Sequence, residues 1–253
     1  VRITNDAGTV VTYDASDATI GASLRLQVKE KVKPVIALVT PTNGARVTNN
    51  KQPITFKVTD ETNGSGVKTS TVSLKIDGNT FNESSTGMTK TAITNGYQFV
   101  YTPQTALSNG DHTITINAQD NDGNAAAVVT ASIKVDTVPP SLNITSPANG
   151  LITNTKSITL EGTTNDATSS PVTVTAKLNG TDVGSITVTN GAFSKALTGA
   201  EGNNTLVVTA RDAAGLTTPV TINFKIDTSV PKIKNVSISP NPADASGLSL
   251  IHI

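Results

Sequence analysis

Two motifs that occur twice along this chain are the features that most constrain its fold. A short apolar stretch ends in Pro-x-Asn-Gly at Pro41–Gly44 and again at Pro147–Gly150. An alternating stretch of apolar and polar residues runs into Asp-x-x-Gly at Asp120–Gly123 and again at Asp212–Gly215. Both motifs are typical of a strand followed by a turn. Because they recur in the same order, they predict serial domains rather than one continuous fold.

The spacing of these motifs predicts the domain boundaries. Each repeat spans about 90–105 residues, a length that suits a β-sandwich. Short linkers containing proline close the repeats, and proline restricts its own backbone and that of the preceding residue, so we expect semi-rigid connections. The predicted parts are the end of a preceding unit (1–32), two whole units (33–138 and 139–229) and the start of a further unit (230–253) that a longer polypeptide would complete.

Short runs with apolar residues at every second position predict strands, and no helical periodicity interrupts them. Thr is the most frequent residue, and Thr, Val and Ile favour strands because their branched Cβ suits a pleated surface. About seven strands per unit indicate an all-β fold with two packed antiparallel sheets. The expected strands are Val35–Thr40, Ile54–Thr59, Val72–Ile76, Thr89–Ile93, Tyr97–Tyr101, Thr113–Ala118 and Val129–Val135, then Leu142–Thr145, Ile158–Gly162, Val172–Leu178, Val183–Thr189, Ala192–Leu197, Leu206–Ala210 and Val220–Ile226. Alternating positions such as Ile114, Ile116 and Ala118 should face the core.

Composition excludes several classes of function. The 19 Lys and Arg balance the 19 Asp and Glu, so no basic excess attracts nucleic acid. Aromatic residues are 3% of the chain and Trp is absent, which removes the usual platforms for stacked bases. The lack of Cys excludes disulfides, thiolate zinc sites and cysteine nucleophiles. No apolar run approaches the ~18 residues of a membrane span.

The motifs together resemble a known family. They are the Asp-Thr-x-x-Pro linkers that begin at Asp136 and Asp227, the strand end Ser146–Gly150, the hairpin Val72–Gly78 and the run Leu107–Gly123. In this order they resemble tandem bacterial immunoglobulin-like domains over almost the whole chain. The resemblance implies tandem immunoglobulin-like antiparallel β-sandwiches, and the missing Cys and Trp exclude an antibody-type core.

The resemblance also implies a role. Such domains usually form stalks, spacers or adhesive modules in large secreted, cell-surface or phage virion proteins, so we expect an extracellular, non-enzymatic spacer whose partners are the neighbouring domains of its own chain. Two alternatives stay open: a module that binds a glycan or cell-surface protein, and an accessory spacer of a secreted hydrolase. His112 is a poor catalytic candidate because its counterpart in the repeat, Asn204, cannot transfer protons at neutral pH.

Acidic residues gather at the predicted junctions between units. In an immunoglobulin-type sandwich the B–C and F–G loops face the entering chain. This places Glu30, Asp60 and Asp120, with Asp122, around one junction. The corresponding residues of the next junction are Asp136, Asp166 and Asp212, although Asp60 aligns in the sequence with Thr164 and Asp166 only lies nearby.

Carboxylates in such a group could bind calcium between units. Ca²⁺ takes about six to eight oxygen ligands, which three carboxylates with carbonyls and water would supply. The competing interpretation is that each Asp forms an Asx-type turn without any metal. We therefore expect no required cofactor, with Ca²⁺ at the junctions as the hypothesis to test.

Overall fold

The computed structural model describes residues 2–4, 10–12 and 30–234. The chain divides into two units, Val1–Val138 and Pro139–Ile253. Strands β1 (Arg2–Thr4) and β2 (Val10–Thr12) pair antiparallel near the N-terminus. The predicted partial units at 1–32 and 230–253 lie largely outside the described residues.

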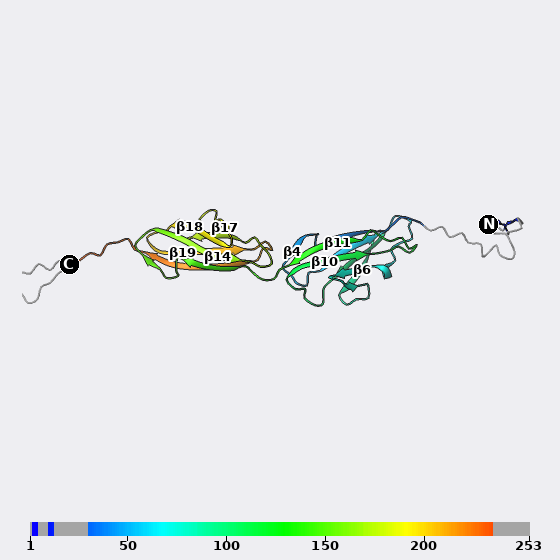
Figure 1. Ribbon diagram of the computed structural model, residues 1–253, viewed down its shortest axis with the longest axis horizontal. Helices are drawn as coiled ribbons and strands as arrows, with labels where there is room; N and C mark the ends of the chain where they lie inside the picture. The colour runs from blue at the N-terminus through cyan, green and yellow to red at the C-terminus, as the bar shows by residue number, and fades with distance from the viewer. Residues whose placement is uncertain (1, 5–9, 13–29, 235–253) are drawn as a thin grey trace, which may run out of the picture. The chain divides into compact units, whose positions relative to one another are not determined.

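Apart from the β1–β2 pair, the first unit consists of two sheets (Figure 1). One has the strand order β3-β5-β9-β8, and the other has the order β4-β11-β10-β6-β7. The strands are β3 (Val35–Thr40), β4 (Ala45–Val47), β5 (Ile54–Thr59), β6 (Ser73–Ile76), β7 (Asn79–Phe81), β8 (Met88–Ile93), β9 (Gly96–Tyr101), β10 (Gly110–Asn117) and β11 (Val129–Val135).

The second unit repeats this arrangement, with the orders β12-β14-β18-β17 and β13-β20-β19-β15-β16. In each unit all neighbours pair antiparallel except one short edge strand, β4 or β13, which runs parallel to β11 or β20. The strands are β12 (Ser141–Ser146), β13 (Ile152–Thr153), β14 (Ser157–Asn165), β15 (Thr173–Leu178), β16 (Thr181–Asp182), β17 (Val188–Thr189), β18 (Ala192–Thr198), β19 (Gly202–Arg211) and β20 (Thr217–Ile226). The predicted all-β, two-sheet fold is confirmed.

One predicted strand is wrong over most of its length. Of Val183–Thr189, only Val188–Thr189 forms a strand, although Ile186 makes an isolated bridge with Val174. A turn interrupts the segment: the Gly184 N–H donates to Asp182 Oδ1 at 2.6 Å, and Gly184 has a φ of +79°. The alternation of Val and Ile in this segment therefore did not indicate a continuous strand.

Each unit packs its own hydrophobic core between its two sheets. In the first unit Phe56 and Phe99 stack with their ring centroids 5.2 Å apart, and Ile114 and Ile116 are fully buried, as predicted. In the second unit the corresponding core contains Leu160, Phe193, Leu206, Val208, Phe224 and Ile226. Each sandwich therefore buries its apolar face without help from the other.

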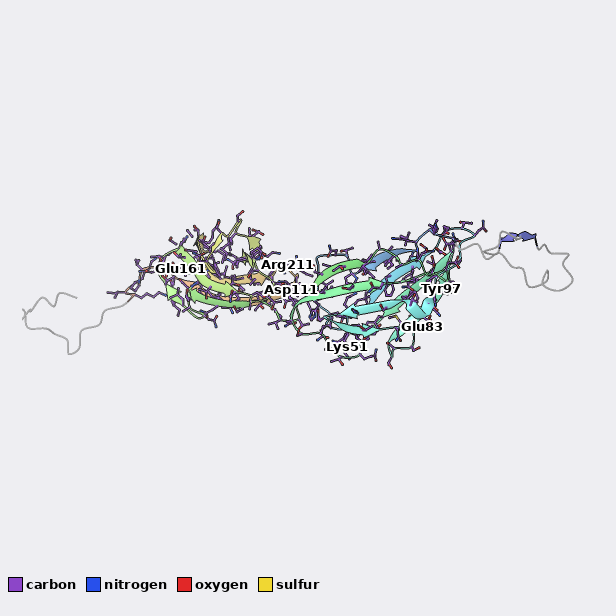
Figure 2. All side chains as sticks on the ribbon, turned by 45° about the vertical axis from the view of Figure 1, so that its right-hand side comes forward. Lys51, Glu83, Tyr97, Asp111, Glu161 and Arg211 are labelled. Carbon is purple, nitrogen blue, oxygen red and sulfur yellow. The ribbon has the colours of Figure 1, made fainter. Side chains whose placement is uncertain are left out.

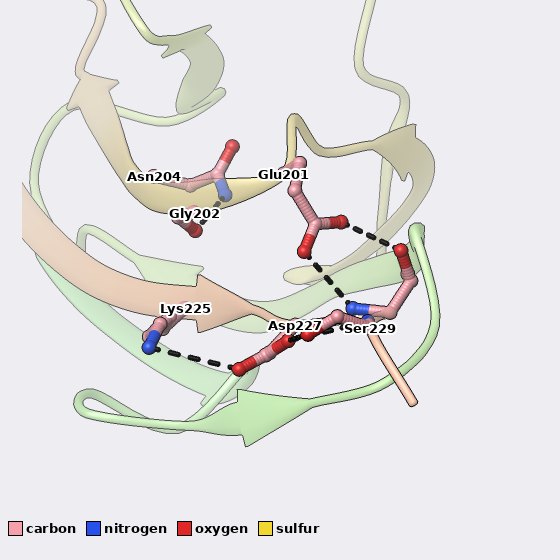
Figure 3. A network of polar contacts seen from close by, with 7 residues as sticks. Glu201, Gly202, Asn204, Lys225, Asp227 and Ser229 are labelled. Atoms are coloured by element: carbon pink, nitrogen blue, oxygen red, sulfur yellow. Dashed lines mark hydrogen bonds and ion pairs between the residues drawn. The ribbon is translucent and has the colours of Figure 1, made fainter. Parts of the chain in front are cut away.

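The segment that leaves each unit is tied to that unit. Thr137 donates its N–H and its hydroxyl to Asn109 Oδ1, both at 3.1 Å. At the end of the second unit Thr228 does the same with the two oxygens of Glu201, at 3.0 and 2.8 Å (Figure 3). Asp227 also accepts from the N–H and hydroxyl of Ser229. The repeated Asp-Thr dipeptide thus anchors the start of each linker.

Candidate metal centre

The first predicted acidic group comes from three segments of the first unit. Asp60 directly follows β5 and opens the loop to β6, whereas Asp120 and Asp122 lie in the loop between β10 and β11. Glu30 lies five residues before β3. Loops that connect neighbouring strands at one end of a sandwich lie close together, which explains why residues so distant in sequence meet here.

Glu30 is held by these loops through hydrogen bonds. Its N–H donates to Asp122 Oδ2 at 2.9 Å, and its carbonyl accepts from Asn124 Nδ2 at 3.0 Å. Its carboxylate accepts from Ser65 Oγ at 3.1 Å and from the Val32 N–H at 2.8 Å. The side chain is therefore fixed in position beside the loop that Asp60 opens.

The closest carboxylates are those of Glu30, Asp60 and Glu61, whose nearest oxygens all lie within 4.8 Å of one another. Asp60 is only 7% exposed. Its Oδ2 accepts from the Gly66 N–H at 2.7 Å, but its Oδ1 has no hydrogen-bond partner, and neither does Glu61 Oε2, although both atoms are buried. Two buried carboxylate oxygens without donors are unusual, because each loses hydration without compensation.

Crowding of these carboxylates changes the pKa of Glu61. A hydrogen bond from its own backbone lowers this pKa, but desolvation, the hydrogen bonds shared with Asp60 and Glu30, and the charge of Asp60 together raise it to about 7. Four ion pairs of the described residues join Lys90 to Glu83, His112 to Asp77, Lys134 to Asp111 and Lys225 to Asp227, and none of these four involves Glu30, Asp60 or Glu61. The group therefore concentrates negative charge.

One of these pairs joins Lys90 to Glu83, whose side chain is labelled on the first unit in Figure 2. Lys90 Nζ lies 2.6 Å from Glu83 Oε2 and 5.2 Å from the centre of the Tyr97 ring. This lysine is engaged with its own neighbours rather than with the acidic group.

Asp120 is fully buried but uses both carboxylate oxygens for a turn. Oδ1 accepts from the Asn124 N–H at 2.8 Å, and Oδ2 accepts from Asn124 Nδ2 at 2.7 Å. Desolvation opposes its ionisation, yet the hydrogen bonds from Asn124, and further ones from Glu30 and Gly123, lower the pKa of Asp120. The structure therefore supports the Asx-turn interpretation for this residue.

The strand register corrects the sequence alignment of the second group. Val35 pairs with Thr59, which precedes Asp60, and Ser141 pairs with Asn165, which precedes Asp166. Asp166, not Thr164, is therefore the counterpart of Asp60. The counterpart of Thr164 is Val58, and both of these side chains are buried.

Within the second unit, Asp166 and Asp212 are buried and have carboxylate oxygens within 4.8 Å of each other. Asp166 Oδ1 accepts from the N–H groups of Thr168 and Ser169, at 2.8 and 2.6 Å. Asp212 Oδ1 accepts from the Leu216 N–H at 2.9 Å, whereas its Oδ2 has no partner. In Asp212, as in Asp60, one carboxylate oxygen therefore stabilises a turn and the other has no hydrogen-bond partner.

Asp136, the remaining predicted ligand, lies at the end of the first unit and is fully buried. Its Oδ1 accepts from the Val138 N–H at 3.1 Å, and its Oδ2 has no partner. Asp136 lies five residues before β12, as Glu30 lies five residues before β3. A calcium site that includes Asp136 stays a prediction.

Sequence reasoning missed Glu61, Ser65 and Asn124. Glu61 directly follows Asp60, so the acidic pair was a usable signal, but the residue after Asp166 is Ala167 and the repeat therefore did not indicate it. Ser65 and Asn124 carry no charge and hold Glu30 through hydrogen bonds alone. Their role depends on contacts that no local motif encodes.

His112 is engaged in structure rather than in a catalytic group. Its Nδ1 lies 2.5 Å from Asp77 Oδ2, and its Nε2 lies 2.7 Å from the Ser108 carbonyl. Its counterpart Asn204 donates from Nδ2 to the Ala200 carbonyl at 2.7 Å and accepts from Asn179 Nδ2 at 2.9 Å. Both side chains thus fasten the loop four residues upstream to the facing turn.

Two family models match this chain, one on each unit. The model described as a bacterial Ig domain matches residues 34–116, and the model described as glucodextranase, domain B, matches residues 140–228. Each match lies within one of the two units.

The chain is a tandem of immunoglobulin-like domains. In both immunoglobulin-like units the four-stranded sheet has the A-B-E-D order of this fold, as β3-β5-β9-β8 and β12-β14-β18-β17. Domains of this kind are typically non-catalytic. No helix among the described residues is long and apolar enough to cross a membrane.

Solved structures with a similar fold include several tandem modules. The fibronectin(III)-like modules of Clostridium thermocellum CbhA are 16% identical, with 80% of this chain and 100% of that chain covered and a TM-score of 0.45. Dimeric latent PorU from Porphyromonas gingivalis is 18% identical, with 79% and 21% covered and a TM-score of 0.35. The Ig1-2 module of the Drosophila receptor tyrosine phosphatase DLAR is 13% identical, with 77% and 98% covered and a TM-score of 0.30. A search of curated proteins finds no match.

Proposed function

We propose that this chain is a non-enzymatic structural spacer, a run of serial immunoglobulin-like units in an extracellular bacterial or phage protein. The observation that supports this most is that each unit ties down its own leaving segment, through Thr137 with Asn109 and through Thr228 with Glu201. A spacer transmits a defined reach only if its linkers are ordered, and these bonds leave few free residues before Pro139 and Pro140.

Distance measurements test the spacer directly. The chain has no cysteine, so Thr130→Cys in β11 and Thr175→Cys in β15 create a unique pair of exposed sites for spin labels. Pulsed electron resonance should give a narrow distance distribution for the parent linker. Replacing Pro139 and Pro140 with glycine should broaden it, because glycine frees the backbone that proline restricts. A parent distribution as broad as that of the glycine variant would contradict the proposal.

The adhesive alternative has one structural feature in its favour. A groove of ≈ 1010 Å³ on the first unit lies between the β6–β7 hairpin and residues 103–108. Phe81 and Tyr101 line it and stack with their ring centroids 4.3 Å apart, beside Asp77 and hydroxyl side chains. Aromatic rings with polar neighbours suit sugar binding. Saturable binding on a glycan array that Phe81→Ala abolishes would favour this function over the spacer.

The third possibility, an accessory spacer beside a hydrolase, draws its support from the model named for domain B of glucodextranase, which matches the second unit. It shares the mechanics of the spacer and differs only in what adjoins these units. The reading frame that surrounds residues 1–253 decides between the two, since a catalytic domain in the same polypeptide would favour the accessory role.

A further inference from the structure

A cluster of carboxylates indicates a cation-binding site only when a second observation, besides the negative charge, also indicates a ligand. In the first unit that observation comes from Asp60. This residue is only 7% exposed, and its buried Oδ1 has no hydrogen-bond partner. Glu61 Oε2 is a second buried oxygen without a donor. Both residues lie in the group whose oxygens converge within 4.8 Å. A cation bound by these carboxylates would compensate for the hydration that their buried oxygens have lost.

We propose that Glu30, Asp60 and Glu61 bind one divalent cation, and that this cation is calcium. Every candidate ligand is a carboxylate oxygen, which suits a hard cation and not zinc, which favours nitrogen and sulfur. Two oxygens on opposite sides of one Ca²⁺ are about 4.6–5.2 Å apart, since each Ca–O distance is about 2.3–2.6 Å. Separations within 4.8 Å therefore fit three ligands of one ion.

The loop backbone is shaped around these carboxylates at Gly64. A Cβ at this residue would lie 2.8 Å from Asp60 Oδ2, 2.8 Å from Glu61 Oε1 and 2.7 Å from Glu61 Cδ. Gly64 does not have the positive φ of the neighbouring Gly66, so its lack of a side chain is explained by space and not by backbone conformation. The backbone of the loop therefore lies directly against the carboxylates of Asp60 and Glu61.

Repetition supplies a third argument. Carboxylates occupy the corresponding positions of the second unit, because Asp166 matches Asp60 in strand register and Asp136 precedes β12 by the same number of residues as Glu30 precedes β3. Turn formation alone accounts for one oxygen of Asp60 and of Asp166. Glu30 and Asp136 likewise each use one carboxylate oxygen for the N–H two residues on, at Val32 and Val138.

Binding in the first unit should hold residues 30–32 more firmly against the loop that begins at Asp60. Glu30 already contacts Ser65, Asp122 and Asn124. A cation would add bonds from the same side chain to Asp60 and Glu61. The expected result is that Ca²⁺ raises the thermal stability of this unit and orders the segment that enters it.

Titration of the full chain with calcium chloride tests the proposal at residue resolution. In amide correlation spectra the signals of Gly64, Ser65 and Gly66 should shift saturably with Ca²⁺, with a Kd of about 0.1–1 mM, the range of extracellular calcium modules. Shifts elsewhere in the chain are recorded separately, so binding at other acidic groups does not obscure this site. Magnesium chloride at equal concentration should give weaker binding, because Mg²⁺ demands stricter octahedral geometry.

Three variants give the test its controls. Asp60→Asn keeps an oxygen for the Gly66 N–H but removes the charge, and should weaken Ca²⁺ binding at least about 10-fold. Gly64→Ala removes no ligand and should weaken binding through the Cβ contact alone. Asp111→Asn, which removes one exposed carboxylate that pairs with Lys134, should leave the affinity unchanged.

Two results would overturn the proposal. One is the absence of saturable shifts at Gly64–Gly66 up to about 10 mM Ca²⁺, well above the weakest Kd expected. The other is an equal response of the parent and of Asp60→Asn, since binding that ignores this charge is not binding at this site. If Asp60→Asn does not fold, the comparison of Gly64→Ala with Asp111→Asn decides the matter.

Discussion

One position of the repeat shows how different side chains perform the same structural task. Asp77 Oδ1 accepts from the Thr113 N–H, and Asn179 Oδ1 accepts from the Thr205 N–H, both at 2.8 Å. Beside them, His112 in one unit and Asn204 in the other bind the carbonyl four residues upstream. The first unit therefore uses an ionisable pair where the second uses two amides, and only the first should respond to pH here.

The His112–Asp77 pair predicts a pH dependence confined to the first unit. Burial lowers the pKa of His112, but the hydrogen bonds to Ser108 and Asp77 and the nearby carboxylates of Asp77 and Asp111 outweigh it and raise this pKa above 6.5. Its stabilisation is therefore present below about pH 6.5 and is lost as the pH rises through the raised value. Ring signals of His112 in NMR titrations should report that raised pKa directly.

Glu61 contributes a stability change of the same sign, over a different range. Its pKa is raised from 4.5 to about 7, so the first unit loses stability as the pH rises across this interval. Asp77→Asn with His112→Asn, which copies the amide pair of the second unit, should abolish the part of the loss that comes from His112 and retain the part that comes from Glu61. Identical pH profiles for the double variant and the parent would contradict the assignment.

Asn124 and Leu216 are matched residues whose side chains differ in their interactions. Asn124 Nδ2 donates to Asp120 Oδ2 and to the Glu30 carbonyl, whereas the corresponding Asp212 Oδ2 has no partner. Asn124→Leu should therefore destabilise the first unit by about 1–3 kcal/mol, the usual cost of an unsatisfied buried group. Urea unfolding measures this cost, and Ala127→Leu, at an exposed position of the same connection between β10 and β11, is the control.

The candidate site could be predicted from the sequence only where the repeat duplicates it. Glu30, Asp60 and Asp120 have acidic counterparts in the second unit, and the structure places the first two within one group. Glu61 corresponds to Ala167 in the second unit, so the repeat did not indicate it. Which oxygens remain unpartnered depends on the loop backbone, and that information is not contained in residue type or spacing.

Among the strands, length decided which could be predicted. The long strands alternate apolar and polar residues and were recognised within a few residues, as for β10 and β11. The edge strands β4, β7, β13 and β16 have two or three residues each and show no usable period. They exist because backbone groups of a neighbouring strand are available for pairing, which is a long-range effect.

A glycine in strand β14 gives a prediction for the packing of two strands. Gly162 takes the place of Phe56, and the ring of Phe193 covers it: a Cβ there would lie 2.6 Å from Phe193 Cζ and 2.5 Å from the Asn143 carbonyl oxygen. Gly162→Ala should destabilise the second unit by about 1–3 kcal/mol through overpacking. Gly180→Ala is the comparison: Gly180 lies in a turn where a Cβ would meet nothing within 4 Å, but its φ is positive. This variant therefore measures the cost of backbone strain without a steric clash. Thermal unfolding of both variants should show whether the contact with Phe193 has the expected cost.

At the scale of the whole molecule, two cores predict two separable responses. Leu206 is fully buried in the core of the second unit, and Ile114 is fully buried in that of the first. Leu206→Ala should cost about 2–5 kcal/mol and lower the unfolding temperature of the second unit alone. Scanning calorimetry should show one shifted transition and one unchanged, and Ile114→Ala should reverse the pattern. A single transition that shifts as a whole would contradict this expectation.

The organisation into two sandwiches could be predicted because the turn motifs recur at domain spacing. Strand pairing order was not predicted from the motifs, because it depends on contacts between segments that are distant in the sequence. The register then changed one detail, since it matched Asp60 with Asp166 although the sequence alignment had matched it with Thr164. Register follows from side-chain packing across the sheet, as in the exchange of Phe56 for Gly162.

The hydrogen bonds that hold each linker bear on how a gene for such units can change in length. Thr137 relies on Asn109 and Thr228 relies on Glu201, each within its own unit, and the entering strand of the second unit is likewise secured by Ser141 with Asn165. The second unit therefore contains the hydrogen bonds that hold both its entering and its leaving segment. Recombination that duplicates or deletes one unit would leave the hydrogen bonds within the neighbouring units intact. A gene encoding such units can therefore lengthen or shorten its product by whole domains.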